Sequence, residues 1–373
     1  MAHDVDPGGL SEFSVVFTDR SLNHMSKKFQ KVMRDISDLL KEVYHADAVA
    51  LVPGGGTYGM EAVARQFASG QKTLVVRNGW FSYRWSQIFE VGGFAAESTV
   101  MVARQAGNEA TAPFAPAPIE EVVAKIHEEK PQVVFAPHVE TSAGVILPDA
   151  YIAAMASAAH EVGALMVLDC IASGCVWVDM KALGVDVLCS APQKGWSASP
   201  SAGLVMMSDK ALERLQNTQS DSFALDLKKW RDIMVAYENG GHAYHATMPT
   251  DALCAFRDTM VETRDYGFDK LRDAQWALGD AVRNLLKRKG ITSVAAEGFG
   301  APGVVVSYTS DPAIQNGSKF AAEGMQIAAG VPLACDEPKG FMTFRLGLFG
   351  LDKLYDVEGT VARLEGVLER ALT

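Results

Sequence analysis

The stretch ALMVLDCIASGCVWVDMKALGVDVLCSAPQKGWSASPSAGLVMMS, residues 164–208, contains three short apolar runs separated by polar or small residues. The runs cover residues 164–168, 185–189 and 203–208, and none of them alternates apolar with polar positions. Such runs are typical of strands that helices bury on both faces. The stretch therefore predicts neighbouring buried strands in a largely parallel α/β layer.

The same pattern extends through the first 210 residues. Helical spacing of apolar residues from Met25 to about Tyr44 predicts an early helix, which Asn23 or Ser26 could cap. After it, short apolar runs alternate with helical stretches; the runs lie at 48–52, 73–76 and 132–136. This alternation favours an α/β fold with a mostly parallel sheet.

The chain is long enough for more than one domain. We expect a flexible N-terminal segment at residues 1–15 and a large domain at 16–255. A single helical pattern follows from about 251 to 290, and such a helix often bridges two domains. Beyond it, apolar runs and helical stretches predict a small α+β domain within residues 256–373.

Composition narrows the class of protein. The chain has 48% hydrophobic and 21% charged residues, as in globular proteins. Its net charge of −11 argues against nucleic acid as the main partner. The most apolar stretch, residues 163–179, is interrupted by Asp169 and is too short to span a bilayer. An odd number of cysteines, five, and a start without signal-peptide character predict a soluble, cytoplasmic protein with free thiols.

A glycine-rich loop follows the run at 48–52. Residues 54–59, GGGTYG, have the spacing G-x-G-x-x-G and precede a helical stretch. Such a loop lets a phosphate approach the backbone at a helix N-terminus. A dinucleotide or a phosphate monoester would fit, and so would a tight turn without a ligand. The next run ends in Arg77 and Asn78 instead of an acidic residue, which weakens the dinucleotide interpretation.

An acid and a lysine follow the next buried runs. Asp169 ends the run at 164–168, where a carboxylate needs a cation or donors; a helix cap or an ion pair is the structural alternative. Lys194 has small, uncharged neighbours, as an enclosed amine would, although a single lysine is more often solvated on the surface. Ligands of open parallel sheets bind at the carboxyl ends of strands. A phosphate loop, a carboxylate for a ring nitrogen and an amine for a Schiff base together predict pyridoxal 5′-phosphate.

With these motifs the chain resembles the class V, fold-type I pyridoxal-phosphate aminotransferases, in the alanine–glyoxylate and serine–pyruvate branch. The resemblance covers roughly residues 23–372 and is strongest at 169–208, where Asp169 and the Gln193–Lys194 pair occur with the family's spacing. PGGGTYGMEAVA (53–64) and HVETSAGVILP (138–148) also match. The resemblance implies a homodimer with shared active sites. It also implies transfer of an amino group from a small α-amino acid to a 2-oxo acid such as glyoxylate or pyruvate.

The resemblance assigns a role to each matching residue. Lys194 would be the Schiff-base lysine and Asp169 the partner of the pyridine nitrogen. Arg345, in MTFRLGLF, would hold the substrate carboxylate, and an arginine in an apolar strand needs an anion in any case. The remaining matches imply contacts with the cofactor. Gly55, Gly56 and Thr57 would form the phosphate loop, and Gln193, before the lysine, would also reach the phosphate. Phe81 would be the stacking ring, Thr141 a hydroxyl near the 3′ oxygen, and Tyr244 and Thr247 two donors lent to the neighbouring subunit.

Two departures keep the substrate open. The family's Gly-Pro-Gly-Pro-like segment is replaced by VVFTDRSLNHMSKK (15–28), which leaves the identity of the amino donor and acceptor undecided. The region after the lysine reads Ser199, Pro200, Ser201 where many relatives have Pro-Pro-Gly. Arg77 and Arg84 could bind a second substrate carboxylate, but structural or solvated roles are the simpler interpretation. We therefore expect a small donor.

Other functions fit parts of the pattern. Cys335 invites comparison with cysteine desulfurases of the same fold, but these normally carry His where this chain has Gln193. A β-eliminating lyase is the better alternative on this scaffold. A dinucleotide-binding module without chemistry would leave Asp169, Lys194 and Arg345 unexplained. His242 and His245 have no carboxylate or cysteine beside them, so no metal site is predicted.

Overall fold

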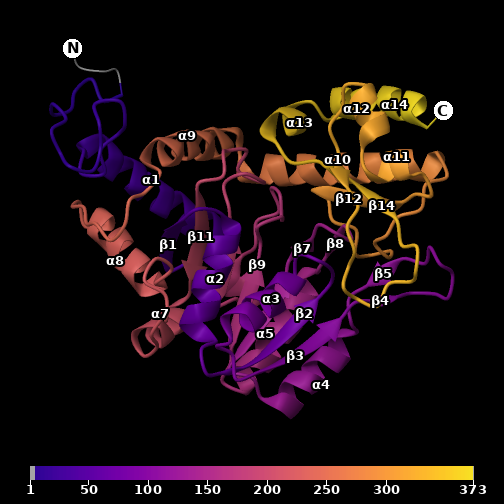
Figure 1. The fold of residues 1–373 in the computed structure, drawn as a ribbon, viewed down its shortest axis with the longest axis horizontal. Coiled ribbons are helices and arrows are strands. Elements are labelled where there is room, and N and C mark those ends of the chain that lie inside the picture. Colours follow the sequence, from indigo (N-terminus) through magenta and orange to yellow (C-terminus); the bar gives the residue numbers. More distant parts are fainter. Residues whose placement is uncertain (1–4, 373) are drawn as a thin grey trace.

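The computed structural model describes residues 5–372 and contains a seven-stranded sheet flanked by helices (Figure 1). Six of the strands run in one direction, and β11 alone runs antiparallel to both of its neighbours. The strands, in order across the sheet, are β1 (Ala48–Pro53), β11 (Ala202–Met207), β10 (Val187–Ser190), β9 (Leu165–Asp169), β6 (Val133–Pro137), β2 (Lys72–Arg77) and β3 (Glu97–Val102). The predicted mostly parallel sheet is confirmed, with one reversed strand.

The central strands are buried along nearly their whole length. Every residue of β6, β9, β10 and β11 is buried. Continuous apolar runs therefore mark strands covered on both faces, as the sequence predicts. The helices that precede or connect these strands are α1 (Lys27–Tyr44), α2 (Gly56–Phe67), α3 (Tyr83–Gly92), α4 (Ile119–Glu129), α5 (Asp149–Glu161), α6 (Met180–Leu183), α7 (Asp209–Gln216) and α8 (Leu227–Glu238).

Helix α1 begins where its capping residue predicts. The side chain of Ser26 accepts a hydrogen bond from the amide of Phe29, so Ser26 is the N-cap. The apolar face of the helix, including Phe29, Ile36 and Leu40, is fully buried in the large hydrophobic core. The predicted cap and the helical spacing are both confirmed.

Helix α2 packs unusually close to β11. A Cβ atom on Gly59 would lie 3.0 Å from the Cα atom of Gly203, and one on Gly203 would lie 2.5 Å from the backbone of Gly59. Neither position has room for a side chain. The helix that follows the glycine loop therefore rests on β11 backbone to backbone.

The predicted single helix after Thr250 is wrong. The structure has two helices, α9 (Thr250–Tyr266) and α10 (Phe268–Arg288), separated by Gly267. Gly267 has a φ angle of 114°, a conformation that favours glycine and that no helix contains. The apolar periodicity continues on both sides of this residue, so the pattern alone does not reveal the break.

The C-terminal part forms a second sheet beside the first, drawn in orange and yellow in Figure 1. Its strands pair in the order β12 (Val304–Tyr308), β14 (Thr343–Gly347), β13 (Ala328–Ala329), and they contact a separate hydrophobic cluster. The accompanying helices are α11 (Pro312–Gln315), α12 (Ser318–Ala322), α13 (Leu351–Tyr355) and α14 (Val357–Ala371). The expected boundary after residue 255 falls inside α9, and the division into domains stays a prediction.

Two short strand pairs complete the fold. They are β4 (Arg104–Gln105) with β5 (Phe114–Ala115), and β7 (Val139–Glu140) with β8 (Val145–Ile146). Within residues 5–372, no helix combines the length and the apolar character that crossing a membrane requires. Part of the predicted flexible segment, residues 1–4, lies outside the described residues.

Candidate active site

The glycine loop, Asp169 and the Lys194 loop meet at the carboxyl ends of the parallel strands. Asp169 ends β9 and lies opposite Cys189 of β10. Cys189 precedes Gln193 by four residues in the chain. A Cβ atom on Gly56, at the start of α2, would lie 2.5 Å from the Ile171 side chain and 3.3 Å from that of Ala191. The three motifs that the sequence placed at strand ends therefore share one edge of the sheet.

The start of α2 presents backbone donors. Gly55 is the N-cap in an extended conformation, and no side chain caps this helix. A Cβ atom on Gly55 would meet no atom within 4 Å, so the space beside the loop is open. An uncapped helix N-terminus with room beside it suits an anion.

Arg84 adds a positive charge to this end of the site. Its Nη1 donates a hydrogen bond to Oγ1 of Thr57 at 3.0 Å. Its guanidinium also lies 5.4 Å from the ring centroid of Phe81. Arg84 is thus a residue of the site, placed near the phosphate loop, whereas the sequence offered only solvated, structural or substrate-binding roles for it.

Asp169 is a buried carboxyl group without a cationic partner among residues 5–372. Its Oδ1 accepts a hydrogen bond from the amide of Ile171 at 2.9 Å. Burial is the main reason why the pKa of Asp169 is raised to about 7; the hydrogen bond from the Ile171 amide opposes this rise, the charge of Glu140 adds to it, and Arg84 opposes it. A cation placed against the carboxyl group of Asp169 would stabilise its charged form.

Lys194 is half-buried, and its side chain makes no hydrogen bond or ion pair within the described part of the chain. Its Nζ lies 5.2 Å from the ring centroid of Phe349. Burial lowers the pKa of Lys194, and the positive charge of Arg345 lowers it further. The side-chain oxygen of Gln193, the preceding residue, is buried without a partner. Burial and the charge of Arg345 both favour the uncharged form of the Lys194 amine, which is its nucleophilic form.

Arg345 reaches the same region from β14 of the second sheet. Its Nε donates to the carbonyl oxygen of Ala329 at 2.8 Å, which fixes the side chain. Its guanidinium lies 5.4 Å from the ring centroid of Phe81, and it forms no ion pair within residues 5–372. Burial lowers the pKa of Arg345, although the charge of Glu140 opposes this effect. The terminal nitrogens remain available for a carboxylate.

Phe81 lies near two of the charged residues, Arg84 and Arg345, at equal centroid distances. The neighbouring Trp80 packs instead against Tyr83 at 5.6 Å, as expected for a side chain that points elsewhere. Thr141 is buried and follows Glu140 at the end of β7. The structure thus gathers the residues predicted on the large sheet, on the aromatic loop and on β14.

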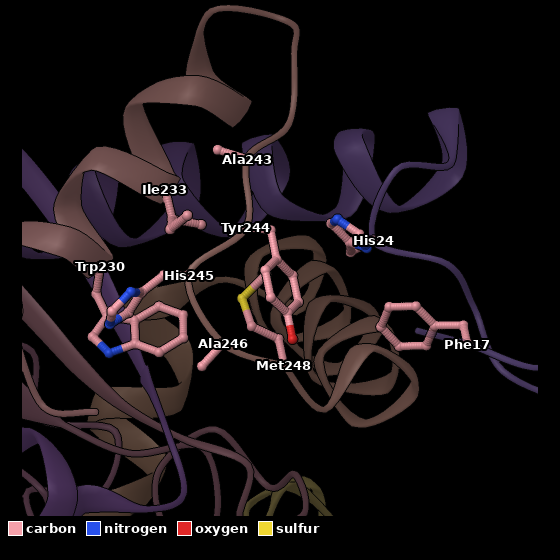
Figure 2. Close-up of a pocket in the computed structure, with 9 residues that line it drawn as sticks. All are labelled: Phe17, His24, Trp230, Ile233, Ala243, Tyr244, His245, Ala246 and Met248. Atoms are coloured by element: carbon pink, nitrogen blue, oxygen red, sulfur yellow. The ribbon is translucent and has the colours of Figure 1, made fainter. Parts of the chain in front are cut away.

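Tyr244 and Thr247 are not among the residues that meet at this edge. Their hydroxyl groups lie 3.0 Å apart, and the Tyr244 ring lies 5.5 Å from that of His24. Figure 2 shows Tyr244 between Phe17 and His245, in a small hollow near α1 and α8. Their predicted role in a neighbouring subunit stays a prediction.

Glu140 is a residue of the site that the sequence interpretation did not single out. It is fully buried and accepts hydrogen bonds from residues of the Phe81 loop. The signal was visible: HVETSAG contains a carboxylate in an otherwise uncharged segment. Two of its partners, Phe81 and Ser82, lie 59 and 58 positions away in the chain, which no local pattern reveals.

Cys335 does not have the environment of a reactive thiol. It is buried, and its sulfur lies within hydrogen-bond distance of the carbonyl oxygens of Arg77 and Leu333. Burial raises the pKa of Cys335 to about 12. A sulfur acceptor needs an accessible thiolate. This geometry therefore argues against the desulfurase alternative.

Comparison with known proteins places the chain among aminotransferases. The model of the family "Aminotransferase class-V" matches residues 12–303. Alanine–glyoxylate aminotransferase 1 of Saccharomyces cerevisiae is 26% identical over 309 residues, covering 78% of each chain. The structure of an alanine–glyoxylate aminotransferase from Nostoc sp. superposes with a TM-score of 0.79 at 22% identity, covering 94% of this chain and 89% of that one. The fold is that of the fold-type I aminotransferases.

Two of the relatives, from Synechococcus sp. and Anabaena cylindrica, carry the name of a hydrogenase subunit. A protein from Synechococcus sp. (strain PCC 6716) called "Soluble hydrogenase, small subunit" is 27% identical, over 93% of this chain and 87% of its own length. The family model spans more than three quarters of the chain and contains the glycine loop, Asp169 and Lys194. These residues form the arrangement described above. The chain belongs to the class-V aminotransferase family.

Proposed function

We propose that this protein is a pyridoxal-phosphate-dependent aminotransferase that moves an amino group from a small α-amino acid to a 2-oxo acid such as glyoxylate or pyruvate. One observation carries the proposal. A buried carboxyl group, an amine and a guanidinium lie in one site, and none of them has an ion-pair partner among the described residues: Asp169, Lys194 and Arg345. Each lacks the partner that this cofactor or its substrate would supply.

The residues present fit the cofactor. The uncapped start of α2, Thr57 and the adjacent Arg84 suit a phosphate dianion. The carboxyl group of Asp169 suits a protonated ring nitrogen. The side-chain oxygen of Gln193 has no partner and could accept a hydrogen bond. Phe81 offers an aromatic face beside both arginines. Buried polar atoms normally have hydrogen-bond partners, so the unpartnered oxygen of Gln193 fits a site that a ligand completes.

The chemistry divides among the protein residues. Pyridoxal phosphate, when bound, withdraws electrons from the substrate Cα. Arg345 binds the substrate carboxylate with two parallel hydrogen bonds and thereby orients the Cα–H bond. The amine of Lys194, whose pKa is lowered, accepts the Cα proton and returns it. Asp169 keeps a proton on the ring nitrogen, which is what makes the electron withdrawal strong.

A small donor is favoured because the other arginines near the aromatic loop are occupied. Arg77 donates to the hydroxyl of Ser86 at 2.8 Å and stacks on the ring of Tyr83. Arg84 is directed at Thr57. Arg345 is then the guanidinium available to a substrate carboxylate in this region. The names of the yeast and Nostoc relatives, which specify alanine and glyoxylate, support the same choice.

A half-reaction screen tests the substrate class. We expect the cofactor-loaded protein, mixed with alanine or serine alone, to release one 2-oxo acid per site without ammonia. The Arg345→Gln variant should need about a hundredfold more amino acid for the same rate, because the charge-assisted pair with the carboxylate is lost. Quantifying 2-oxo acid and ammonia together provides the measurement. Reaction with dicarboxylic donors alone would refute the small donor, and steady ammonia release would indicate the lyase.

We further propose a homodimer with shared active sites. Tyr244 and Thr247 are exposed, and Tyr244 contacts Thr247 and His24, which are not residues of the site around Lys194; donors lent to a neighbour would be placed in this way. The N-terminal residues Leu10, Phe13 and Val15 are each more than 90% exposed, so they are available for a second chain to cover. Tyr244 and Thr247 would complete the neighbour's site, and the exposed side chains of Leu10, Phe13 and Val15 would contribute apolar contacts to the association.

Sedimentation equilibrium tests the assembly. We expect a mass about twice the 40.1 kDa of the chain, because a subunit alone would lack the donors of its phosphate site. The Tyr244→Phe variant should remain dimeric and bind pyridoxal phosphate about tenfold more weakly, through loss of one hydrogen bond. A fully active monomer would contradict the proposal.

We also propose a cytoplasmic location with no nucleic-acid or membrane partner. All five cysteines are free thiols in the structure, which suits a reducing compartment. The net charge of −11 disfavours binding to phosphate backbones.

A further inference from the structure

Glu140 makes a dense set of hydrogen bonds at the end of β7. Its side chain is completely inaccessible to solvent, and it has no ion-pair partner among residues 5–372. It accepts five hydrogen bonds instead, from three backbone amides and two hydroxyl groups. The donors are the amide of Phe81 at 3.2 Å, the amide and hydroxyl of Ser82 at 2.8 and 2.7 Å, and the amide and hydroxyl of Ser142 at 3.0 and 2.7 Å.

This arrangement explains how a buried carboxylate is tolerated. An isolated charge in the interior is costly unless hydrogen-bond donors replace its water. Donors to Glu140 occupy both oxygens, and the Phe81 and Ser82 amides lie at the beginning of α3, where a helix stabilises negative charge. The carboxylate therefore holds two segments together, residues 78–82 and 140–142.

Other contacts lock the same two segments. The amide of Trp80 donates to the hydroxyl of Ser142 at 2.9 Å. A Cβ atom on Gly79 would lie 2.1 Å from that hydroxyl and 2.7 Å from the Glu140 side chain, so only glycine fits. Three consecutive amides, from Trp80 to Ser82, are thus fixed by Glu140 and its neighbour Ser142.

The consequence falls on Phe81. Its backbone is held by Glu140, while its ring lies against Arg345 and Arg84. We propose that Glu140 is the positioning residue of the site: it fixes the Phe81 ring beside Arg345, where the ring would stack on the cofactor. The inference rests on the proposed function, because that function makes Phe81 the stacking ring. Glu140 itself touches neither substrate nor cofactor in this proposal.

The Glu140→Gln variant isolates this role. The substitution keeps the volume but replaces one oxygen with an NH₂ group, which must then face an amide donor of Ser82 or of Phe81 and Ser142. Donors facing each other lose their hydrogen bond, and the loop loosens without leaving a cavity. Glu140→Asp, which keeps both oxygens, should lie between Gln and wild type.

Glu337 provides a matched control. It accepts hydrogen bonds from the amides of Leu333, Ala334 and Cys335, so it clamps a different loop by the same chemistry. Glu337→Gln should loosen residues 333–337 and leave the Phe81 loop unchanged. Comparing the two variants separates a specific effect at the site from a general loss of stability.

Hydrogen exchange of the cofactor-free protein is the first measurement. We expect amides of residues 80–82 to exchange about tenfold faster or more in Glu140→Gln, and at the wild-type rate in Glu337→Gln. The second measurement is pyridoxal phosphate binding, which should weaken about tenfold in Glu140→Gln alone. Unchanged exchange or unchanged affinity in Glu140→Gln would overturn the inference. If the wild-type protein itself fails to bind pyridoxal phosphate, the proposed function fails, whatever the exchange data show.

Discussion

Replacing Lys194 with alanine should abolish amino-group transfer, lowering the rate by a factor of about 10⁴ or more. Burial and the positive charge of Arg345 lower the pKa of the Lys194 amine, which favours the uncharged form that can accept a proton. Alanine leaves nothing at this position to take the Cα proton. The rate is followed as pyruvate formed from alanine and glyoxylate.

Lys210 is a suitable control for this variant. Burial lowers its pKa as well, but its Nζ lies 3.5 Å from the Asp186 carboxylate and donates to the carbonyl oxygen of Ala164. Lys210→Ala should therefore retain most of the activity. Borohydride reduction of the loaded wild-type protein, followed by peptide mapping, should place the pyridoxyl group on Lys194. Modification of another lysine, or activity in Lys194→Ala, would refute the assignment.

Replacing Asp169 with asparagine should reduce the rate by roughly 10²-fold or more, since an amide cannot stabilise a protonated ring nitrogen. The same change should stabilise the protein without its cofactor. Burial raises the pKa of Asp169 to about 7 from the ordinary 3.8, so the folded state holds a proton that the unfolded state has lost. Stability of the cofactor-free wild type therefore falls as the pH rises from about 4 to about 7 and levels off above that.

Thermal and denaturant unfolding of both cofactor-free proteins measures this effect. One pKa unit corresponds to about 1.4 kcal/mol. The free energy of unfolding of Asp169→Asn relative to that of the wild type should therefore increase by a few kcal/mol between pH 4 and pH 8. The variant thus gains stability where it loses activity. Turnover equal to wild type would mean that Asp169 is structural, and a pH-independent stability difference would show that its carboxyl group is not buried in the way described.

Much of this site could be predicted because its residues follow buried strands. Asp169 and Lys194 come after apolar runs, and the glycine loop comes between a run and a helix, so local patterns place all three at one sheet edge. Arg345 was assigned by resemblance, and its position beside Phe81 depends on the second sheet packing near the first. A contact between residues 264 positions apart leaves no local trace.

The features that the sequence did not reveal depend on direction or on distant partners. The run that forms β11 reads the same whether the strand is parallel or antiparallel, so its reversal has no signature. Gly267 breaks a helical pattern that continues on both sides of it. Glu140 and Arg84 act through partners elsewhere in the chain, Ser82 and Thr57. Their roles follow from the three-dimensional contacts alone.

The contact between Gly59 and Gly203 has a mechanical consequence. Most helices rest on a sheet through side chains, which can change rotamer and let the helix shift by fractions of an ångström. At this point no side chain lies between α2 and the sheet, because the backbone of Gly59 contacts the backbone of Gly203 directly. The amides at the start of α2 are then carried as a rigid extension of β11, the strand that follows the Lys194 loop. Thermal motion moves the loop and the sheet together, so their spacing is preserved while both fluctuate.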